Sequence, residues 1–306
     1  MYNEERKQRY MKEKMNEVVM PEYCLMARFR ESEIFEKELQ KDICDFSVYE
    51  ITEFYKMLNF SSLGFLAYLN SQFSMYTQWC LQSNLVKDNQ NHFLEFSRET
   101  LNNCLNKVII KKQIVDRDTI LQMVRELVNP RDQFIILALF EIGKAKDFAD
   151  IWGAKLSQIS ENDHTMKTAT GRIVHVSDDF IHLAKLADAT KEYYGVGSAK
   201  QIKRTLLDEG YIVKDYANVR SNASDFNRGR NIYRAVARNL KYLDMEYMSA
   251  TTIVESGKLY MIKTKAQELG MTNKDFIYSK HIGEVAEQYG CKIERSNYAL
   301  KYGDLL

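Results

Sequence analysis

The chain has 306 residues, of which 45% are hydrophobic and 28% are charged, with 43 Lys and Arg against 42 Asp and Glu. This length suits two domains of ordinary size, and the composition is that of a globular protein with enough apolar material for real cores. A net charge of +1 excludes a strongly basic protein, so any contact with nucleic acid would depend on local clusters of charge.

Simple features of the sequence exclude several other classes of protein. The longest apolar run, residues 134–140, is far shorter than the roughly 20 residues that a membrane-spanning helix needs. The first residues are charged and no apolar segment follows them, so we expect no secretory signal and an intracellular protein. The five cysteines and five histidines show no metal-ligand spacing. We therefore expect no disulfide framework, no bound metal and no cofactor.

The first part of the chain predicts helices. We expect a helical extension over residues 1–30 and a helical domain over residues 31–112, which ends in a basic run. Residues 47–50 have the spacing of a capping box. A helix over residues 63–81 would turn its apolar side chains inward at Leu66, Leu69, Phe73, Tyr76 and Cys80.

The second domain, residues 113–306, mixes helices with a small amount of strand. Residues 132–142 predict a fully buried segment. Residues 165–176 alternate around a central glycine and predict a β-hairpin. A further short strand is expected at residues 211–213, and the chain from residue 229 onward should be mostly helical.

A basic helix carries the strongest local chemistry. Arg230, Arg234 and Arg238 recur every four residues and would share one face, while Ile232, Val236 and Leu240 would share another. Like charges at this spacing repel, and arginine binds phosphate oxygens in pairs, so a polyanion would stabilise the row. A solvated basic face, or pairing with distant carboxylates, is the alternative.

The order of these elements resembles that of the tyrosine recombinases and phage integrases. The segments FSVYEITEF (46–54), NPRDQFIILALF (129–140) and KTATGRIVHVSDD (167–179) are similar to parts of that family, and the resemblance covers roughly residues 31–290. It implies a mainly α-helical, two-domain fold with a small antiparallel β-sheet. Residues 31–112 would form the helical core-binding domain, and residues 113–306 the α+β catalytic-like domain.

In that family a tyrosine attacks a DNA phosphodiester, two arginines and a histidine stabilise the phosphate, and a hairpin lysine protonates the leaving oxygen. At the first arginine this sequence offers only Lys144 or Lys146. In the motif that holds the second arginine, Thr251 replaces the histidine and Val254 replaces the arginine. Because preorganised positive charge is usually the largest catalytic term, we expect no strand cleavage and no enzyme activity.

Other parts of the family's site are present. By the resemblance, Lys167 stands where the hairpin lysine belongs, and His281 and Tyr289 have nearly the separation of the last histidine and the nucleophile. With 19 tyrosines in the chain, packing is an alternative role for Tyr289.

DNA binding needs a clamp rather than catalytic arginines, and double-stranded DNA is the expected partner. Base edges would be reached from the first domain by Asn70, Gln72 and Tyr76. Phosphates would be contacted by Lys107, Lys111, Lys112, Lys167, Arg172, Arg228, Arg230, Arg234, Arg238, Lys241, Ser249, Thr251, Thr252 and Lys258. For the hydroxyls near residue 250, simple helix capping is an equal alternative.

A recombinase scaffold without catalysis resembles the prophage master repressors that have this fold. The resemblance implies a sequence-specific repressor that maintains lysogeny in the bacterial cytoplasm, at the nucleoid, with self-association or a regulatory protein as further partners. Two alternatives remain. One is a divergent but active recombinase, and the other is a helical adaptor for protein partners.

Overall fold

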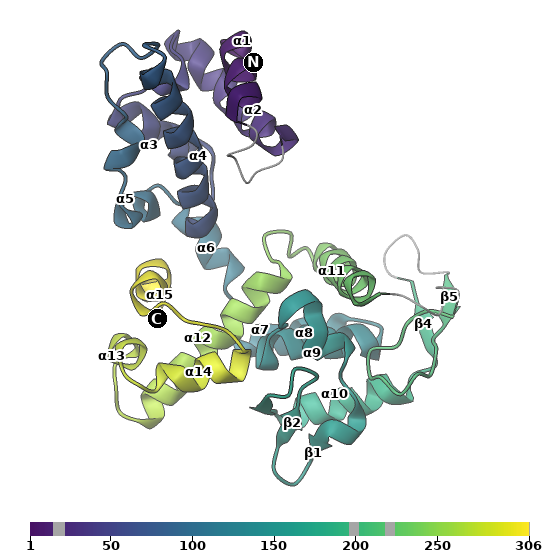
Figure 1. Ribbon diagram of the computed structural model, residues 1–306. Coiled ribbons are helices and arrows are strands. Elements are labelled where there is room, and N and C mark those ends of the chain that lie inside the picture. Colours follow the sequence, from purple (N-terminus) through teal and green to yellow (C-terminus); the bar gives the residue numbers. More distant parts are fainter. Residues whose placement is uncertain (15–21, 196–201, 218–223, 306) are drawn as a thin grey trace. The chain divides into compact units, whose positions relative to one another are not determined.

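The computed structural model describes residues 1–14, 22–195, 202–217 and 224–305, and it divides the chain into two compact units (Figure 1). Unit 1 is Met1–Ile110 and unit 2 is Lys111–Leu306. The division falls inside the short helix α6 (Lys107–Gln113), two residues before the boundary that the sequence predicts.

Unit 1 is built from helices throughout its described residues. Besides α6 they are α1 (Glu4–Lys14), α2 (Glu22–Leu39), η1 (Ile43–Asp45), α3 (Val48–Met57), α4 (Leu63–Gln82), η2 (His92–Glu95) and α5 (Arg98–Asn103). The predicted capping box at the start of α3 is confirmed, since Ser47 and Glu50 each accept a hydrogen bond from the other's backbone N–H. The predicted inward side chains of α4 are confirmed as buried.

Residues 1–30 are not a separate extension, which corrects the expectation from sequence. Helix α2 runs through residues 30 and 31 without a break. Tyr10 of α1 and Phe29 of α2 pack edge-on against Tyr76 of α4, inside the same aromatic core. Tyr10 and Phe29 are both buried, so α1 and α2 contribute to the core of unit 1.

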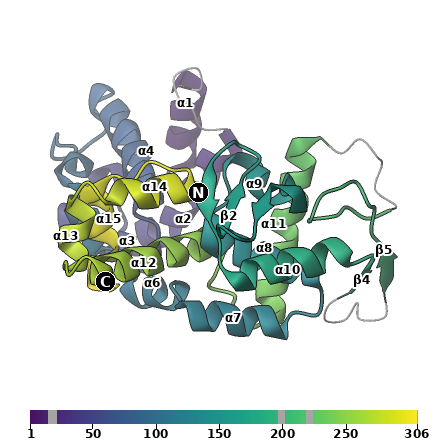
Figure 2. The same ribbon diagram turned by 90° about the horizontal axis from the view of Figure 1, so that it is seen from below.

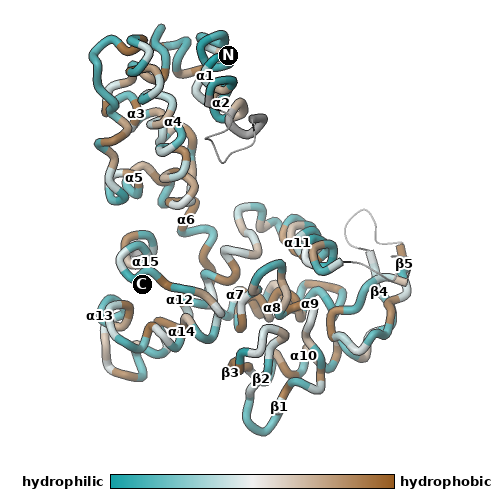
Figure 3. The backbone as a smooth tube through the Cα atoms, in the orientation of Figure 1, coloured by the Kyte–Doolittle hydropathy of each residue, from teal (hydrophilic) through white to brown (hydrophobic). Residues whose placement is uncertain are grey.

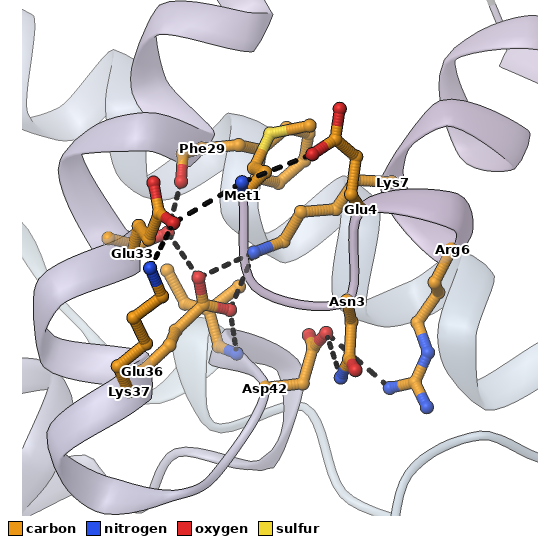
Figure 4. Close-up of polar contacts among 12 residues, drawn as sticks. Met1, Asn3, Glu4, Arg6, Lys7, Phe29, Glu33, Glu36, Lys37 and Asp42 are labelled. Carbon is orange, nitrogen blue, oxygen red and sulfur yellow. Dashed lines mark hydrogen bonds and ion pairs between the residues drawn. The ribbon is translucent and has the colours of Figure 1, made fainter.

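A buried ion pair fastens α1 to α2 (Figure 4). The Lys7 ammonium and the Glu36 carboxylate are both fully buried, with Nζ 2.5 Å from Oε2. Ser32 and the backbone N–H of Ile43 donate to the same carboxylate. Burial raises the pKa of Glu36, against the opposing effect of the Lys7 charge. The charged form of Glu36 is therefore stabilised inside unit 1 by the Lys7 ammonium.

Unit 2 contains the remaining elements. Its helices are α7 (Arg117–Glu126), α8 (Pro130–Ile142), η3 (Lys146–Phe148), α9 (Ala149–Trp152), η4 (Leu156–Gln158), α10 (Asp178–Ala189), α11 (Asp225–Tyr242), α12 (Ala250–Glu268), α13 (Asn273–Tyr278), α14 (Ile282–Tyr289), α15 (Arg295–Tyr302) and η6 (Gly303–Leu305). Its strands are β1 (Ile159–Ser160), β2 (Thr165–Lys167), β3 (Ile173–His175), β4 (Glu192–Tyr194) and β5 (Lys203–Thr205).

Helix α8 is the centre of unit 2. Nearly all of its side chains are buried, as the apolar run at residues 132–142 predicts. Helices α7, α10, α11 and α12 pack around it, and much of its trace is brown in Figure 3. The same arrangement is seen from below in Figure 2. Because α8 is enclosed, the elements at its C-terminal end have fixed positions.

The predicted hairpin is confirmed and gains a third strand. Strands β1, β2 and β3 form an antiparallel sheet in that order, with Met166 opposite Val174. A second antiparallel pair, β4 and β5, was not expected from sequence. The predicted strand at 211–213 is wrong, because these residues form a bend in which Ile212 donates its N–H to the carbonyl of Ala154.

Candidate nucleic-acid interface

The three side chains that sequence placed at base edges lie inside unit 1. The Asn70 amide accepts a hydrogen bond from the Tyr55 hydroxyl and donates to the Phe93 carbonyl. Gln72 is buried, and Tyr76 is fully buried among aromatic rings. These contacts hold the helices of unit 1 together, so none of the three is available to read DNA.

Charge is distributed unevenly between the two units. Unit 1 has 13 Lys and Arg against 16 Asp and Glu, whereas unit 2 has 30 against 26. Phosphate contacts contribute most of the affinity of DNA-binding proteins, and they come mainly from basic side chains. Because of its excess of positive charge, unit 2 is the better candidate for phosphate contacts.

Helix α11 presents an open basic face in unit 2. Ser224 caps its N-terminus, and Ile232, Val236 and Leu240 bury its apolar stripe as predicted. On the opposite face Arg230, Arg234 and Lys241 are exposed, and none of the three forms an ion pair with another described residue. Unneutralised guanidinium groups on a rigid helix suit binding to phosphate oxygens.

Two of the predicted arginines of α11 have partners in the protein. Arg228 lies on the buried side, near the carboxylates of Glu209 and Asp215. Arg238 donates to the Tyr193 hydroxyl at 2.6 Å. Burial alone would lower the pKa of Arg238, but Tyr193 and Asp132 outweigh it and raise the pKa. In the predicted row, Arg230 and Arg234 therefore form no ion pair with another described residue, whereas Arg238 is bonded to Tyr193.

The structure brings Lys144 and Thr251 together, as the family resemblance implies. Lys144 follows α8 and donates to the Thr251 hydroxyl at 3.2 Å, at the start of α12. The turn around it is strained, because Ala145 has a φ of 52° and Asp147 a φ of 51°. This turn packs directly on α11. Lys146 thus belongs to a turn that packs on α11 at the buried Gly229, and Lys144 lies two residues before it.

Other residues at α12 have structural roles. Ser249 and Thr252 form a reciprocal cap, which matches the capping alternative for these hydroxyls. Val254 is buried. Lys258 is also buried and lies 2.9 Å from Glu255, so the prediction that it contacts phosphate is wrong. Burial tends to lower the pKa of Lys258, but the Glu255 charge and Cys291 outweigh it and raise the pKa.

Tyr289, the candidate nucleophile, is enclosed in the core. Its hydroxyl donates to the carbonyl of Phe140 at 2.6 Å, and only 5% of the residue is exposed. A side chain at Gly257 would collide with its hydroxyl and with the Phe140 carbonyl, and one at Gly143 would crowd its ring. Burial, with the charges of Glu141 and Glu255, raises its pKa well above the ordinary value for tyrosine. The phenol is therefore neutral and directed inward.

Arg172 is a structural residue, which corrects its assignment as a phosphate contact. Its guanidinium pairs with the fully buried Asp150 and donates to the carbonyls of Ile142, Glu287 and Gln288. Gln288 in turn bonds to both backbone groups of His175. These contacts join the ends of α8 and α14 to the sheet. Sequence indicated neither Asp150 nor Gln288 for this role.

The remaining predicted residues are scattered over both units. Lys167 is exposed on β2. Lys107 is half-buried in unit 1, while Lys111 and Lys112 are exposed in unit 2. His281 precedes α14 and pairs with Glu284 at 2.9 Å, with its ring stacked on Phe276. It has an acidic partner and does not meet Tyr289 at an open site.

Neither a metal centre nor a membrane span is found in the described residues. No three side chains of His, Cys, Asp or Glu gather there in a way that could hold an ion. None of the helices within those ranges is both long and apolar enough to cross a membrane.

Comparisons with known proteins match the whole chain. Residues 1–82 match the model of the MrpR N-terminal core-binding domain, and residues 114–303 match that of the MrpR C-terminal catalytic domain. A curated relative is the SPbeta prophage-derived uncharacterized protein YopR of Bacillus subtilis strain 168, at 24% identity over 99% of this chain and 92% of that protein.

Among solved structures, the chain is similar to the integrase of transposon Tn1549 in complex with circular intermediate DNA. The identity is 13%, the TM-score is 0.42, and the match covers 96% of this chain and 98% of the integrase chain. A variant of that integrase, also with circular intermediate DNA, matches at 13% identity and a TM-score of 0.41, over 98% and 99% of the two chains. The two domain models together span most of the chain, which therefore belongs to the MrpR family and has a two-domain fold of the tyrosine-recombinase type.

Proposed function

We propose that this protein binds double-stranded DNA in a sequence-specific manner without cutting it, and that it acts as a prophage repressor of transcription. The observation that carries the proposal is the enclosed Tyr289, whose hydroxyl is bonded to a backbone carbonyl inside unit 2. A nucleophile must reach a phosphorus atom, whereas this hydroxyl is buried and its phenol is held neutral.

The electrostatics around this position also argue against cleavage. Val254 places a buried isopropyl group where the family has an arginine. Lys144 is held at the other arginine position, but a lysine gives a single point charge rather than a bidentate fork. Loss of even one donor at such a site costs roughly 10²–10³ in rate, so a phosphorane-like transition state is left without its main stabilisation.

DNA binding is supported by what remains exposed. Arg230, Arg234 and Lys241 form a row without acidic partners on α11, and Lys144 and Lys146 lie on the adjoining turn. Such a surface attracts phosphates and orients the protein on DNA. The role in prophage regulation rests on the family and on its full-length likeness to a prophage-derived relative.

Salt dependence tests the interface. Affinity for a 30-base-pair duplex of random sequence is measured by fluorescence anisotropy from about 50 to 300 mM salt. Each phosphate contact contributes about 0.9 to the slope of log K against log salt, so Arg230→Gln with Arg234→Gln should lower the slope by about two. The matched control is Lys185→Gln with Lys265→Gln, because both lysines are already paired with glutamates. An equal slope in both variants would exclude α11.

Cleavage and regulation need separate measurements. Fragments of the DNA element that carries the gene are incubated with the protein, and covalent complexes are sought by potassium–SDS precipitation. We expect no covalent complex, and a complex that disappears in Tyr289→Phe would establish a recombinase instead. Mapping of bound sites in cells should show a repeated element near promoters, whereas a single attachment site would contradict the repressor assignment.

A further inference from the structure

The exposed face of α11 carries aromatic rings as well as arginines. Phe226 and Tyr233 are 64% and 58% exposed. Covering exposed rings of this size removes apolar surface from water, which is energetically favourable. Two such rings on one helix face are therefore typical of a surface that binds a partner.

The two rings lie together at one edge of the basic row. Phe226 is three residues before Gly229 and Tyr233 is four residues after it, so all three are neighbours along one side of the helix. Gly229 is where α11 crosses the turn at Asp147, since a side chain there would collide with the Asp147 carbonyl. The rings therefore lie on the side of α11 that faces this turn.

Basic residues stand on both sides of this aromatic pair. Arg230 and Arg234 follow on the open side of α11, while Lys144 and Lys146 belong to the turn on the other side. A polyanion that neutralises both sets of charges would pass directly over the two rings. The charge complementarity therefore selects nucleic acid as the occupant of this face, in preference to an apolar protein surface.

We infer that Phe226 and Tyr233 insert against the bases of bound DNA and partly unstack one base step. This inference rests on the proposed function and specifies the form of DNA that the protein prefers. Apolar and aromatic wedges between base steps kink the duplex, and the unstacking costs a few kcal/mol per step. That cost is smallest where the bases are already unpaired or mismatched.

The prediction is a preference for distorted DNA. A 30-base-pair duplex of random sequence is compared with the same duplex carrying two adjacent central mismatches, by anisotropy at one salt concentration. We expect the wild-type protein to bind the mismatched duplex roughly ten-fold more tightly, because part of the unstacking has already occurred. The double variant Phe226→Ala with Tyr233→Ala removes both wedges and should bind both duplexes equally.

The salt dependence separates this inference from the proposed function. Removing the rings changes no charge, so the double alanine variant should keep the wild-type slope, unlike the variant without Arg230 and Arg234. Tyr278→Ala is the matched control, since Tyr278 is 48% exposed on α13. Melting temperatures confirm that the variants are folded.

Each outcome has a definite meaning. If the double alanine variant retains the preference for mismatched DNA, or the wild-type protein shows none, the wedge is excluded while DNA binding by the arginines stands. If the wild-type protein binds neither duplex at low salt, the proposed function fails as well. Equal losses in Tyr278→Ala and in the double variant would likewise overturn the assignment to α11.

Discussion

Replacing Tyr289 by phenylalanine distinguishes a packed tyrosine from a nucleophile. In an active recombinase the hydroxyl is needed for chemistry and contributes little to folding. Here the hydroxyl donates at 2.6 Å to the carbonyl of Phe140, within the last turn of α8, where backbone acceptors lack helical partners. The Tyr289→Phe variant keeps the ring between Gly143 and Gly257 but leaves this carbonyl buried without its partner.

The size of the effect follows from the cost of an unsatisfied buried acceptor. That cost is about 1–3 kcal/mol. For a unit of about 200 residues, 1 kcal/mol lowers the melting temperature by about 2–4 °C, so a decrease of about 2–12 °C is expected. Differential scanning calorimetry of the full chain measures the transition of unit 2, and anisotropy with the random duplex measures DNA affinity, which should not change.

The control is Tyr278→Phe, which removes a hydroxyl from an exposed ring and should leave the melting temperature within about 1 °C. A Tyr289→Phe variant that melts like the wild type would show that the hydroxyl contributes nothing to packing. If the variant also lost a covalent DNA complex that the wild type forms, Tyr289 would be a nucleophile.

Three further predictions concern unit stability. Lys7→Met leaves the Glu36 carboxylate buried alone and should destabilise unit 1 by about 3–5 kcal/mol in urea, whereas adding Glu36→Leu should restore most of the loss. Arg172→Met should lower the melting temperature of unit 2 without changing the salt slope of DNA binding, because Asp150 loses its partner; a changed slope would reinstate the phosphate role. The raised pKa of Tyr289 stabilises the folded state below pH 10, and this contribution is lost as the pH rises above about 10 and the unfolded phenol ionises. Alkaline unfolding followed by circular dichroism should therefore be less steep in Tyr289→Phe.

Helices α4 and α11 show when a sequence pattern predicts which side chains of a helix are buried. In α11 the two stripes differ in chemistry, with arginines on one face and Ile232, Val236 and Leu240 on the other, so burial could be predicted. Helix α4 has no charged residue in its 20 positions. Its apolar spacing predicts that Tyr76 lies inward, but its polar side chains give no indication of where Asn70 points. Only the hydrogen bond from Asn70 to the Phe93 carbonyl in η2 shows that this amide is part of the core.

Around the recombinase-like site, too, some features follow from the sequence and others do not. Strand alternation around Gly171 predicted the hairpin, and the family resemblance assigned Lys144 and Thr251 to one site, where the structure joins them by a hydrogen bond. The pairing of Arg172 with Asp150 joins residues 22 positions apart, and no periodicity encodes such a contact.

The sequence by itself determined the two-part helical architecture, the hairpin and the basic face of α11, because each depends on a local period of apolar and polar residues. The replacement at Val254 was also visible there, since a side chain's chemistry needs no coordinates. The tertiary structure alone decided that Tyr289 is enclosed and that Arg172 and Lys258 are structural. The physical reason is that burial and ion pairing depend on which distant segments approach a side chain, and both determine whether its charge or hydroxyl is available to DNA.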